Sequence, residues 1–330
     1  MISILMPVFN TEKYLSDCLD SILRQTQKNW ELLAVNDRST DGSRLILEQY
    51  AARDGRIKVL DNTNKGIIPA LRLAYAQSRG ELITRMDSDD LMTAHKLQAL
   101  KQTVLSYDGQ VATGKVKYFT EEGEIGAGYR KYEQWLNQLG IHRYAEIYKE
   151  CVIPSPCWMI RRQDLDRVGA FHSDRYPEDY DLCFRFYHHQ IGVQTHEDIL
   201  HLWRDRPDRI SRTGEHYANN SFLDLKLHYY LQHEYDKSKE FYIWGAGKKG
   251  KKVAQFLIKK DIPFQWITDN PRKCGVVIYD KQLVSSSLLT TRQPDEIQGI
   301  ILVANPAEQQ DIWYKLKQIN IPKDSFIAFC

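Results

Sequence analysis

The chain has 330 residues, of which 42% are hydrophobic and 27% charged, so we expect a globular protein of about two domains. Its 45 basic and 43 acidic residues leave a net charge of +2, which excludes the strongly basic character of a typical nucleic-acid-binding protein. The six cysteines include no C-x-x-C pair, and no apolar run approaches the roughly 20 residues that span a bilayer. We therefore expect a soluble, cytoplasmic protein whose membrane association, if any, is peripheral.

The first hundred residues alternate β-rich runs with helical periodicity. Strands are predicted at residues 2–8, 31–36, 57–61 and 82–86, with a helix between each consecutive pair. Such alternation predicts a mainly parallel sheet covered by helices, with ligands bound where the strands end. From about residue 111 to 210 the pattern is irregular, which favours a mixed sheet with long loops.

A second α/β pattern occupies the C-terminal part of the chain. Residues 213–238 predict a connecting helix, and residues 239–330 predict a small Rossmann-like α/β domain. Further strands are predicted there at residues 264–268 and 300–304. Residues 239–330 are the basic part of the chain, with 14 basic and nine acidic residues.

The C-terminal domain carries a glycine-rich turn after its first strand. Gly245, Gly247 and Gly250 fit the pattern G-x-G-x-x-G, and Asp269 follows 19 residues after Gly250, close to the spacing of a ribose-binding acid. Nucleotide binding, partner docking and assembly of a homo-oligomer all remain open for this domain. The lysines beside the turn are equally well explained as a solvated start of a helix.

Two aspartates follow the predicted strand at residues 82–86. In an extended segment, Asp87 and Asp89 lie on the same side, where hard oxygen ligands can hold Mn²⁺ or Mg²⁺ bridged to a diphosphate. The metal would assist departure of a nucleotide as a Lewis acid. An acidic helix N-terminus explains the same residues, so this motif alone leaves both interpretations open.

Polar clusters also end the neighbouring strands, and a carboxylate pair follows later. The clusters are Pro7-Val8-Phe9-Asn10, residues 35–42 and Asn64-Lys65-Gly66, and the pair is Glu178-Asp179. Together with the aspartates, these motifs resemble the family-two glycosyltransferases of the GT-A fold, over roughly residues 1–212. The resemblance implies a GT-A nucleotide-diphospho-sugar transferase domain with a mixed, mainly parallel sheet.

The resemblance also implies roles for individual residues. Asp37 would accept the uracil N–H of a uridine diphosphate donor, Asp87 would hold its ribose, and Asp89 would bind Mn²⁺ or Mg²⁺ together with Asp87. The donor-binding residues that it implies are Pro7, Phe9, Asn10, Asp37, Asn64, Lys65, Asp87, Ser88 and Arg206.

The pair Glu178-Asp179 opens a predicted helix and, by the same resemblance, supplies the general base. That role falls on Asp179, with Glu178 beside it. A single base opposite the leaving group implies inversion at the anomeric carbon. N-terminal capping of the helix is the structural alternative for both residues.

The sequence departs from the family pattern at two places. Ser155 stands where many members have the histidine of a His-Pro pair, and Arg206 stands where a metal-side histidine often lies. An arginine does not bind a metal but can clamp a diphosphate. Trp158 and Trp135 are candidate acceptor-binding residues; a core-facing tryptophan and an ordinary amphipathic helix explain them equally well.

The function implied is that of an inverting, metal-dependent hexosyltransferase. It would move a hexose from a UDP-sugar to a hydroxyl of a glycan acceptor such as lipooligosaccharide or capsule. A metal-dependent nucleotidyltransferase is an alternative, but residues 7–12 contain no glycine for a phosphate loop. A non-catalytic glycan- or nucleotide-binding scaffold is another, against which the intact aspartates count. An oxidoreductase lacks a substrate domain after residue 250.

Overall fold

The computed structural model describes residues 1–206 and 222–330. The chain forms two compact units, which within these residues comprise 1–147 with 151–206, and 148–150 with 222–330. The proposed domain boundary at residues 212 and 213 lies outside the described residues. No helix among those described is long and apolar enough to cross a membrane.

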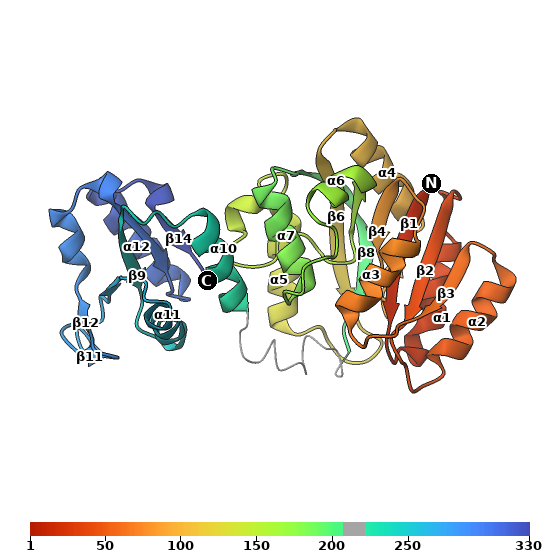
Figure 1. The fold of residues 1–330 in the computed structure, drawn as a ribbon, viewed down its shortest axis with the longest axis horizontal. Helices are drawn as coiled ribbons and strands as arrows, with labels where there is room; N and C mark the ends of the chain where they lie inside the picture. The colour runs from red at the N-terminus through yellow and green to blue at the C-terminus, as the bar shows by residue number, and fades with distance from the viewer. Residues whose placement is uncertain (207–221) are drawn as a thin grey trace. The chain divides into compact units, whose positions relative to one another are not determined.

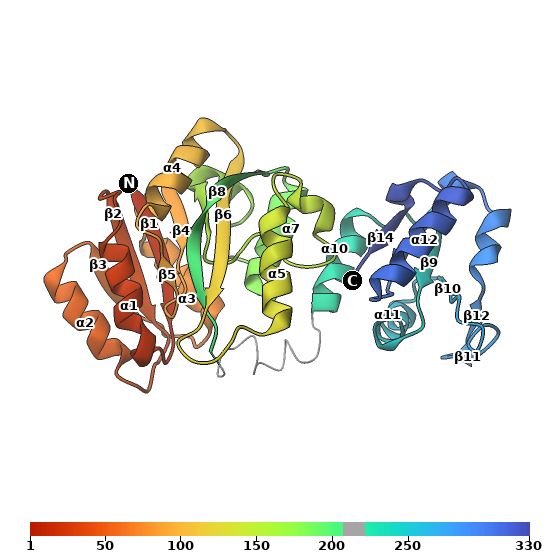
Figure 2. The same cartoon turned by 180° about the vertical axis from the view of Figure 1, so that it is seen from behind.

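The N-terminal unit is built on an eight-stranded sheet between helices (Figures 1 and 2). The strand order is β3-β2-β1-β4-β7-β6-β8-β5. Its strands are β1 (Ile2–Val8), β2 (Trp30–Asn36), β3 (Ile57–Asp61), β4 (Leu82–Arg85), β5 (Leu91–Met92), β6 (Gln110–Phe119), β7 (Trp158–Arg161) and β8 (Gly192–Arg204). Its helices are α1 (Glu12–Leu23), α2 (Ser43–Arg53), α3 (Ile67–Gln77), α4 (Lys96–Ser106), α5 (Ala127–Gln138), η1 (Arg143–Glu146), α6 (Arg162–Arg167) and α7 (Glu178–His188).

The sheet is mixed, as the irregular second half of this unit predicts. β1 runs parallel to β2 and β4, and β2 runs parallel to β3. β7 is antiparallel to both β4 and β6, whereas β6 and β8 are parallel. The strands β1 to β4 are those that the sequence predicts, within one residue at each end.

Period-two alternation along β1 explains how this sheet and α1 form one core. Ile2, Ile4, Met6 and Val8 are fully or almost fully buried, and they share a cluster with the apolar face of α1. That face contributes Leu15, Cys18, Leu19 and Ile22 at helical spacing. This packing holds α1 against the sheet and so fixes the position of the loop between β1 and α1.

The C-terminal unit contains a six-stranded sheet in the order β11-β12-β10-β9-β13-β14. It consists of β9 (Glu240–Trp244), β10 (Gln265–Ile267), β11 (Val277–Ile278), β12 (Lys281–Val284), β13 (Ile297–Ile301) and β14 (Phe326–Ala328), with α10 (Phe222–His233), α11 (Lys248–Lys259), α12 (Pro306–Gln318), η2 (Ser286–Thr291), η3 (Pro294–Glu296) and η4 (Lys323–Ser325). All neighbouring strands are parallel except β11 and β12. β13 begins three residues earlier than predicted, because Gln298 and Gly299, which interrupt the apolar run in the sequence, also pair with β9.

Candidate active site

Three neighbouring parallel strands end at one edge of the N-terminal sheet. The register pairs Val8 of β1 with Asn36 of β2 and Leu5 of β1 with Arg85 of β4, so the segments that follow all emerge at the same edge. These segments carry the predicted motifs around Asn10, Asp37 and Asp87. The structure therefore brings the three predicted motifs to the same edge of the sheet, as the strand pattern predicts.

Asp37 ties the loop after β3 to the end of β2. Its carboxylate accepts the Gly66 N–H at 2.9 Å and the Asn62 side-chain amide at 2.6 Å. Gly66 has a φ of 124°, which glycine adopts without strain. The same loop carries Asn64 and Lys65, so Asp37 holds the predicted nucleotide-side segment against the sheet edge.

Two further contacts bind the first loop to its neighbours. Asn10 has a left-handed φ of 51°, and its side-chain oxygen accepts the N–H of Thr40 at 2.8 Å. The Lys65 ammonium lies 5.2 Å from the centre of the Phe9 ring. Pro7 lies in β1, opposite Val35 of β2. These contacts shape the wall of the site and leave the Phe9 ring partly exposed.

Ser88 belongs to the structural base of the site. Its hydroxyl is buried and accepts a hydrogen bond from Thr11 Oγ1 at 3.0 Å. Since Thr11 precedes α1, this bond joins the aspartate segment to the first loop. The geometry gives Ser88 a positioning contact between the two motifs.

Asp89 is a largely buried carboxylate in acidic surroundings. Its Oδ2 accepts a hydrogen bond from Arg206 Nε at 2.9 Å. Burial, followed by the charges of Asp90 and Asp87, raises the pKa of Asp89 to about 6, and Arg206 opposes that rise. Carboxylates this close together repel one another when ionised, and an additional cation would reduce that repulsion.

The donor set suits a hard divalent cation that shares its coordination with a ligand. Among the residues that the structure describes, no three His, Cys, Asp or Glu side chains are arranged to hold a metal ion. Asp87 and Asp89 can supply carboxylate oxygens, and Mg²⁺-type sites commonly combine one or two carboxylates with substrate phosphates and water. The residues therefore fit a metal held jointly with a diphosphate.

A buried chain of polar groups fixes the end of the aspartate segment. Asp90 Oδ2 lies 2.9 Å from His201 Nε2, and His201 Nδ1 lies 3.0 Å from the Lys96 ammonium. Asp90 Oδ1 also accepts the N–H of Arg204 at 2.8 Å. Sequence reasoning missed His201, which is fully buried on β8.

The predicted base lies at the start of α7. Asp179 Oδ1 accepts the N–H of Tyr180 at 2.8 Å. Burial and the neighbouring charge of Glu178 raise the pKa of Asp179 to about 7, whereas Arg85 opposes the rise. A carboxylate with such a pKa can accept a proton near neutral pH.

Arg85 connects the two acidic motifs. Its guanidinium contacts Asp87 Oδ1 at 3.0 Å and Glu178 Oε1 at 2.8 Å. Sequence reasoning missed this residue too, although a charged side chain at the end of the apolar run Leu82-Ile83-Thr84 is a usable signal. The arginine therefore links the segment after β4, which carries Asp87 and Asp89, to α7, which carries the candidate base.

The candidate acceptor residues differ in their surroundings. Trp158 is 3% exposed and lies edge-on to Phe186, with ring centres 6.5 Å apart, so the structure places it in the core. Trp135 is partly buried and stacks on Tyr132. The Ser155 hydroxyl is buried without a hydrogen-bond partner among the described residues.

This fold is that of the glycosyltransferases of the GT-A type. The family model "Glycosyl transferase family 2" matches residues 3–169, and the chain belongs to that family. Glycosyltransferase GlyG of Streptococcus pneumoniae is 30% identical over 221 residues, which cover 64% of this chain and 73% of GlyG.

Solved structures share the fold at low sequence identity. Residues 1–349 of S. aureus TarS, in complex with UDP-GlcNAc, match with a TM-score of 0.56 at 18% identity, covering 78% of this chain and 71% of TarS 1–349. The Pyrobaculum calidifontis mannosyltransferase PcManGT, in complex with GDP-Man and Mn²⁺, matches with a TM-score of 0.52 at 17% identity, covering 71% and 64%. At this sequence identity, both comparisons show a shared fold and nothing more.

Proposed function

We propose that this glycosyltransferase moves a hexose from a UDP-sugar to a hydroxyl of a glycan acceptor, with inversion at the anomeric carbon. The observation that carries the proposal is the Arg85 bridge, which sets the Asp87 and Asp89 segment beside a helix start whose carboxylate, Asp179, has a pKa raised to about 7. This arrangement supports a donor site and a proton acceptor that lie close to each other.

The donor is bound by the loops that follow the first strands. Asp37, held by Gly66 and Asn62, offers carboxylate oxygens to the uracil N–H, and Pro7, Phe9 and Asn10 form the adjoining wall. The loop with Asn64 and Lys65 lines the nucleotide side, and Asp87 and Ser88 lie where the ribose would bind. The UDP-GlcNAc complex of TarS supports a uridine donor on this fold.

The transfer step is a direct displacement. The acceptor oxygen forms a bond to the anomeric carbon from the face opposite the diphosphate, while the bond between that carbon and the diphosphate oxygen breaks. The acceptor proton passes to a carboxylate oxygen of Asp179, and the bonding electrons leave with UDP. One displacement inverts the configuration.

The leaving group needs positive charge. A divalent cation, Mn²⁺ or Mg²⁺, would neutralise the charge that develops on the diphosphate when held by Asp89 and Asp87. Arg206, within hydrogen-bonding distance of Asp89, supplies a second cation on the same side. The PcManGT complex with Mn²⁺ supports a metal on this fold.

The acceptor class follows from the family rather than from the geometry of this site. We infer a growing bacterial surface glycan, such as lipooligosaccharide or capsule, reached from the cytoplasmic face of the membrane. A peripheral association would suffice for such an acceptor. Trp135 remains the candidate sugar-contacting aromatic residue, because Trp158 is committed to the core.

The test is release of UDP from a panel of nucleotide sugars, with Mn²⁺, Mg²⁺ or EDTA present. We expect metal-dependent release from one UDP-sugar, which Asp89→Asn abolishes and which Glu122→Gln, an exposed carboxylate change, leaves intact. Asp179→Asn should retain donor binding and lose transfer by at least about 100-fold.

Four results would contradict the proposal in part or as a whole. Full activity of Asp89→Asn in EDTA would show that transfer needs no metal. Normal transfer by Asp179→Asn would show that another group is the base. Product with retained anomeric configuration removes the single displacement. Absence of both binding and release across the panel favours the non-catalytic scaffold.

A further inference from the structure

The strand order of the C-terminal sheet reverses at its first strand, β9. The chain builds outward from β9 to β10 and β12, then returns to place β13 on the other side of β9. Such a switch point leaves a crevice at the carboxyl ends of parallel strands, which is where open α/β sheets bind ligands. The proposed transfer reaction does not involve this unit.

The glycine turn after β9 has the geometry that close packing of a helix requires. Gly245 has a φ of 121°, and a side chain at Gly250 would place a Cβ 1.9 Å from the Gly245 carbonyl oxygen. A Cβ at Gly247, in contrast, would meet no atom within 4 Å. Two glycines are thus required by the protein's own packing, while the third leaves open space at the start of α11.

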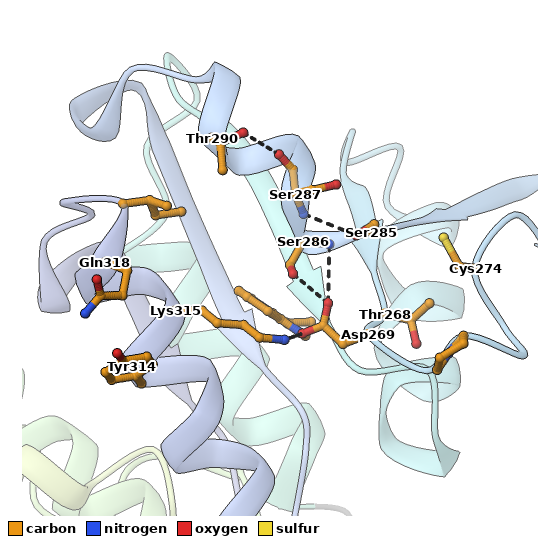
Figure 3. A pocket seen from close by; sticks show the side chains of 13 residues that line it. Thr268, Asp269, Cys274, Ser285, Ser286, Ser287, Thr290, Tyr314, Lys315 and Gln318 are labelled. Atoms are coloured by element: carbon orange, nitrogen blue, oxygen red, sulfur yellow. Dashed lines mark hydrogen bonds and ion pairs between the residues drawn. The ribbon is translucent and has the colours of Figure 1, made fainter.

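A cavity of about 620 Å³ lies at the same end of the sheet. It is bordered by Trp244 at the end of β9, by Thr268 and Asp269 after β10, by the serines that follow β12, and by the last turns of α12 (Figure 3). Its volume falls within the range of small-molecule sites, about 300–1,000 Å³. The cavity is therefore large enough for a nucleoside.

The carboxylate of Asp269 is fixed in the cavity wall. Oδ1 accepts the hydroxyl of Ser286 at 2.6 Å, and Oδ2 accepts the Lys315 ammonium at 2.7 Å, as Figure 3 shows. The side chain is still 27% exposed. A carboxylate that is oriented and accessible is suited to accept hydrogen bonds from the two hydroxyls of a ribose.

The cavity lining carries no net charge. Asp269 and Lys315 are its charged residues and neutralise each other, and the other polar side chains carry hydroxyls, an amide, the Cys274 thiol and the Trp244 indole. Such a lining suits a neutral polyhydroxylated group better than a phosphate. Tyr314, which is 65% exposed at the rim, adds an aromatic face on which a flat ring can stack.

Positive charge lies instead at the glycine turn. The Lys273 ammonium donates to the Ala246 carbonyl oxygen at 3.0 Å, and Lys248 begins α11 directly after Gly247. The ammonium of Lys249 lies 3.4 Å from Cys330 Sγ. Because Trp244 borders the cavity and Gly245 follows it directly, a ligand with a neutral part in the cavity can place an anionic part at the turn.

We propose that this cavity binds the ribonucleoside part of a nucleotide, with Asp269 as the acceptor of its ribose hydroxyls and the phosphates directed to the Gly245–Gly247 turn. A 2′-phosphate would meet the Asp269 carboxylate, so the ligand has free 2′ and 3′ hydroxyls. The site is separate from the donor site in the N-terminal unit.

Calorimetric titration of the full chain with ADP and UDP, and with their 2′-deoxy counterparts, tests the proposal. We expect at least one ribonucleotide to bind a site whose affinity falls about tenfold or more in Asp269→Asn. The 2′-deoxy compound should bind wild type with a comparable loss, and Asp269→Asn should no longer distinguish the two. Asp311→Asn, an exposed acid on α12, is the matched control.

Separate variants distinguish this site from the donor site. Binding at the C-terminal cavity should survive Asp37→Asn and should weaken in Tyr314→Ala, which changes an exposed side chain and leaves the fold intact by circular dichroism. The proposal is overturned if neither ADP nor UDP binds. It is also overturned if Asp269→Asn and Tyr314→Ala bind like wild type, or if all binding disappears in Asp37→Asn.

Discussion

Arg85 Nη1 lies 2.8 Å from Glu178 Oε1, across 93 positions of the sequence. Arg85 is 5% exposed, and its guanidinium also contacts Asp87. The arginine lowers the pKa of Asp179, while burial and Glu178 raise it. Burial is the largest influence on the pKa of Asp179, and the buried cation of Arg85 offsets part of the rise.

Removing this cation should move the pH dependence of transfer upward. Because Asp179 acts in its ionised form, kcat/KM of the wild type should fall on the acid side with a midpoint near pH 7. In Arg85→Gln we expect that midpoint to rise by about one pH unit or more. Arg85→Lys, which keeps a cation, should shift it less. Coincident acid limbs in all three proteins would separate Arg85 from the base.

The Glu178→Gln variant should shift the same limb in the opposite direction. The charge of Glu178 is the second cause, after burial, of the raised pKa of Asp179. A neutral amide removes that repulsion, so we expect the acid midpoint to fall by about one pH unit. The measurement is again kcat/KM against pH. A shift upward would show that loss of the Arg85 contact outweighs loss of the repulsion.

The sequence was sufficient to predict that the candidate motifs lie at one edge of the sheet, and the strands show why. Residues 2–8 and 57–61 form strands with the predicted bounds, because their apolar runs are short, β-rich and bounded by polar turns. The parallel register then brings Asp37 and Asp87 to one edge without further information. Local pattern and topology agree in this half of the sheet.

Contacts between distant segments could not be predicted in this way. His201 meets Asp90 only because β8 pairs with β5 across 111 positions, and nothing in its local sequence indicates that partner. Trp158 lies in the core because β7 inserts antiparallel between β4 and β6. Sequence periodicity does not specify such pairings, so the role of each residue depended on the fold.

Asp89 should carry a stability cost that depends on pH. Its folded-state pKa of about 6 exceeds the usual value near 4, so the folded protein retains a proton that the unfolded chain has already lost. The free energy of unfolding therefore falls as the pH rises from about 4 to 6, and remains lower above that. Asp89→Asn does not titrate and avoids this loss.

In metal-free buffer at pH 8, we expect Asp89→Asn to increase the free energy of unfolding by about 1–2 kcal/mol, with no gain at pH 4. Urea unfolding at the two pH values, with EDTA present, measures the difference. Glu122→Gln serves as the neutral control. A gain of equal size at both pH values would assign the effect to packing rather than to ionisation.

Removal of His201 should destabilise the N-terminal unit. His201→Leu leaves the buried carboxylate of Asp90 without its imidazole partner and separates it from Lys96. Asp90 keeps the Arg204 N–H, so we expect the loss of one buried hydrogen bond to a charged group to cost about 1.5–3 kcal/mol. His95→Ala removes an exposed imidazole and should change stability by less than about 0.5 kcal/mol. Chemical denaturation compares the two, and similar losses would show that the buried chain contributes little.

The two glycines at the start of α11 should respond differently to the same added methyl group. In Gly250→Ala the new Cβ would lie 1.9 Å from the Gly245 carbonyl oxygen, which must move, and we expect a loss of about 2 kcal/mol or more in the C-terminal unit. In Gly247→Ala the methyl group enters open space on an extended backbone, so the loss should stay below about 1 kcal/mol. Amide hydrogen exchange in β9 and β13 reports the stability of this sheet directly. Equal protection in the two variants would mean that α11 does not pack as closely on the Gly245 turn as in the structure. The open space at Gly247 would then no longer support the proposed nucleotide site.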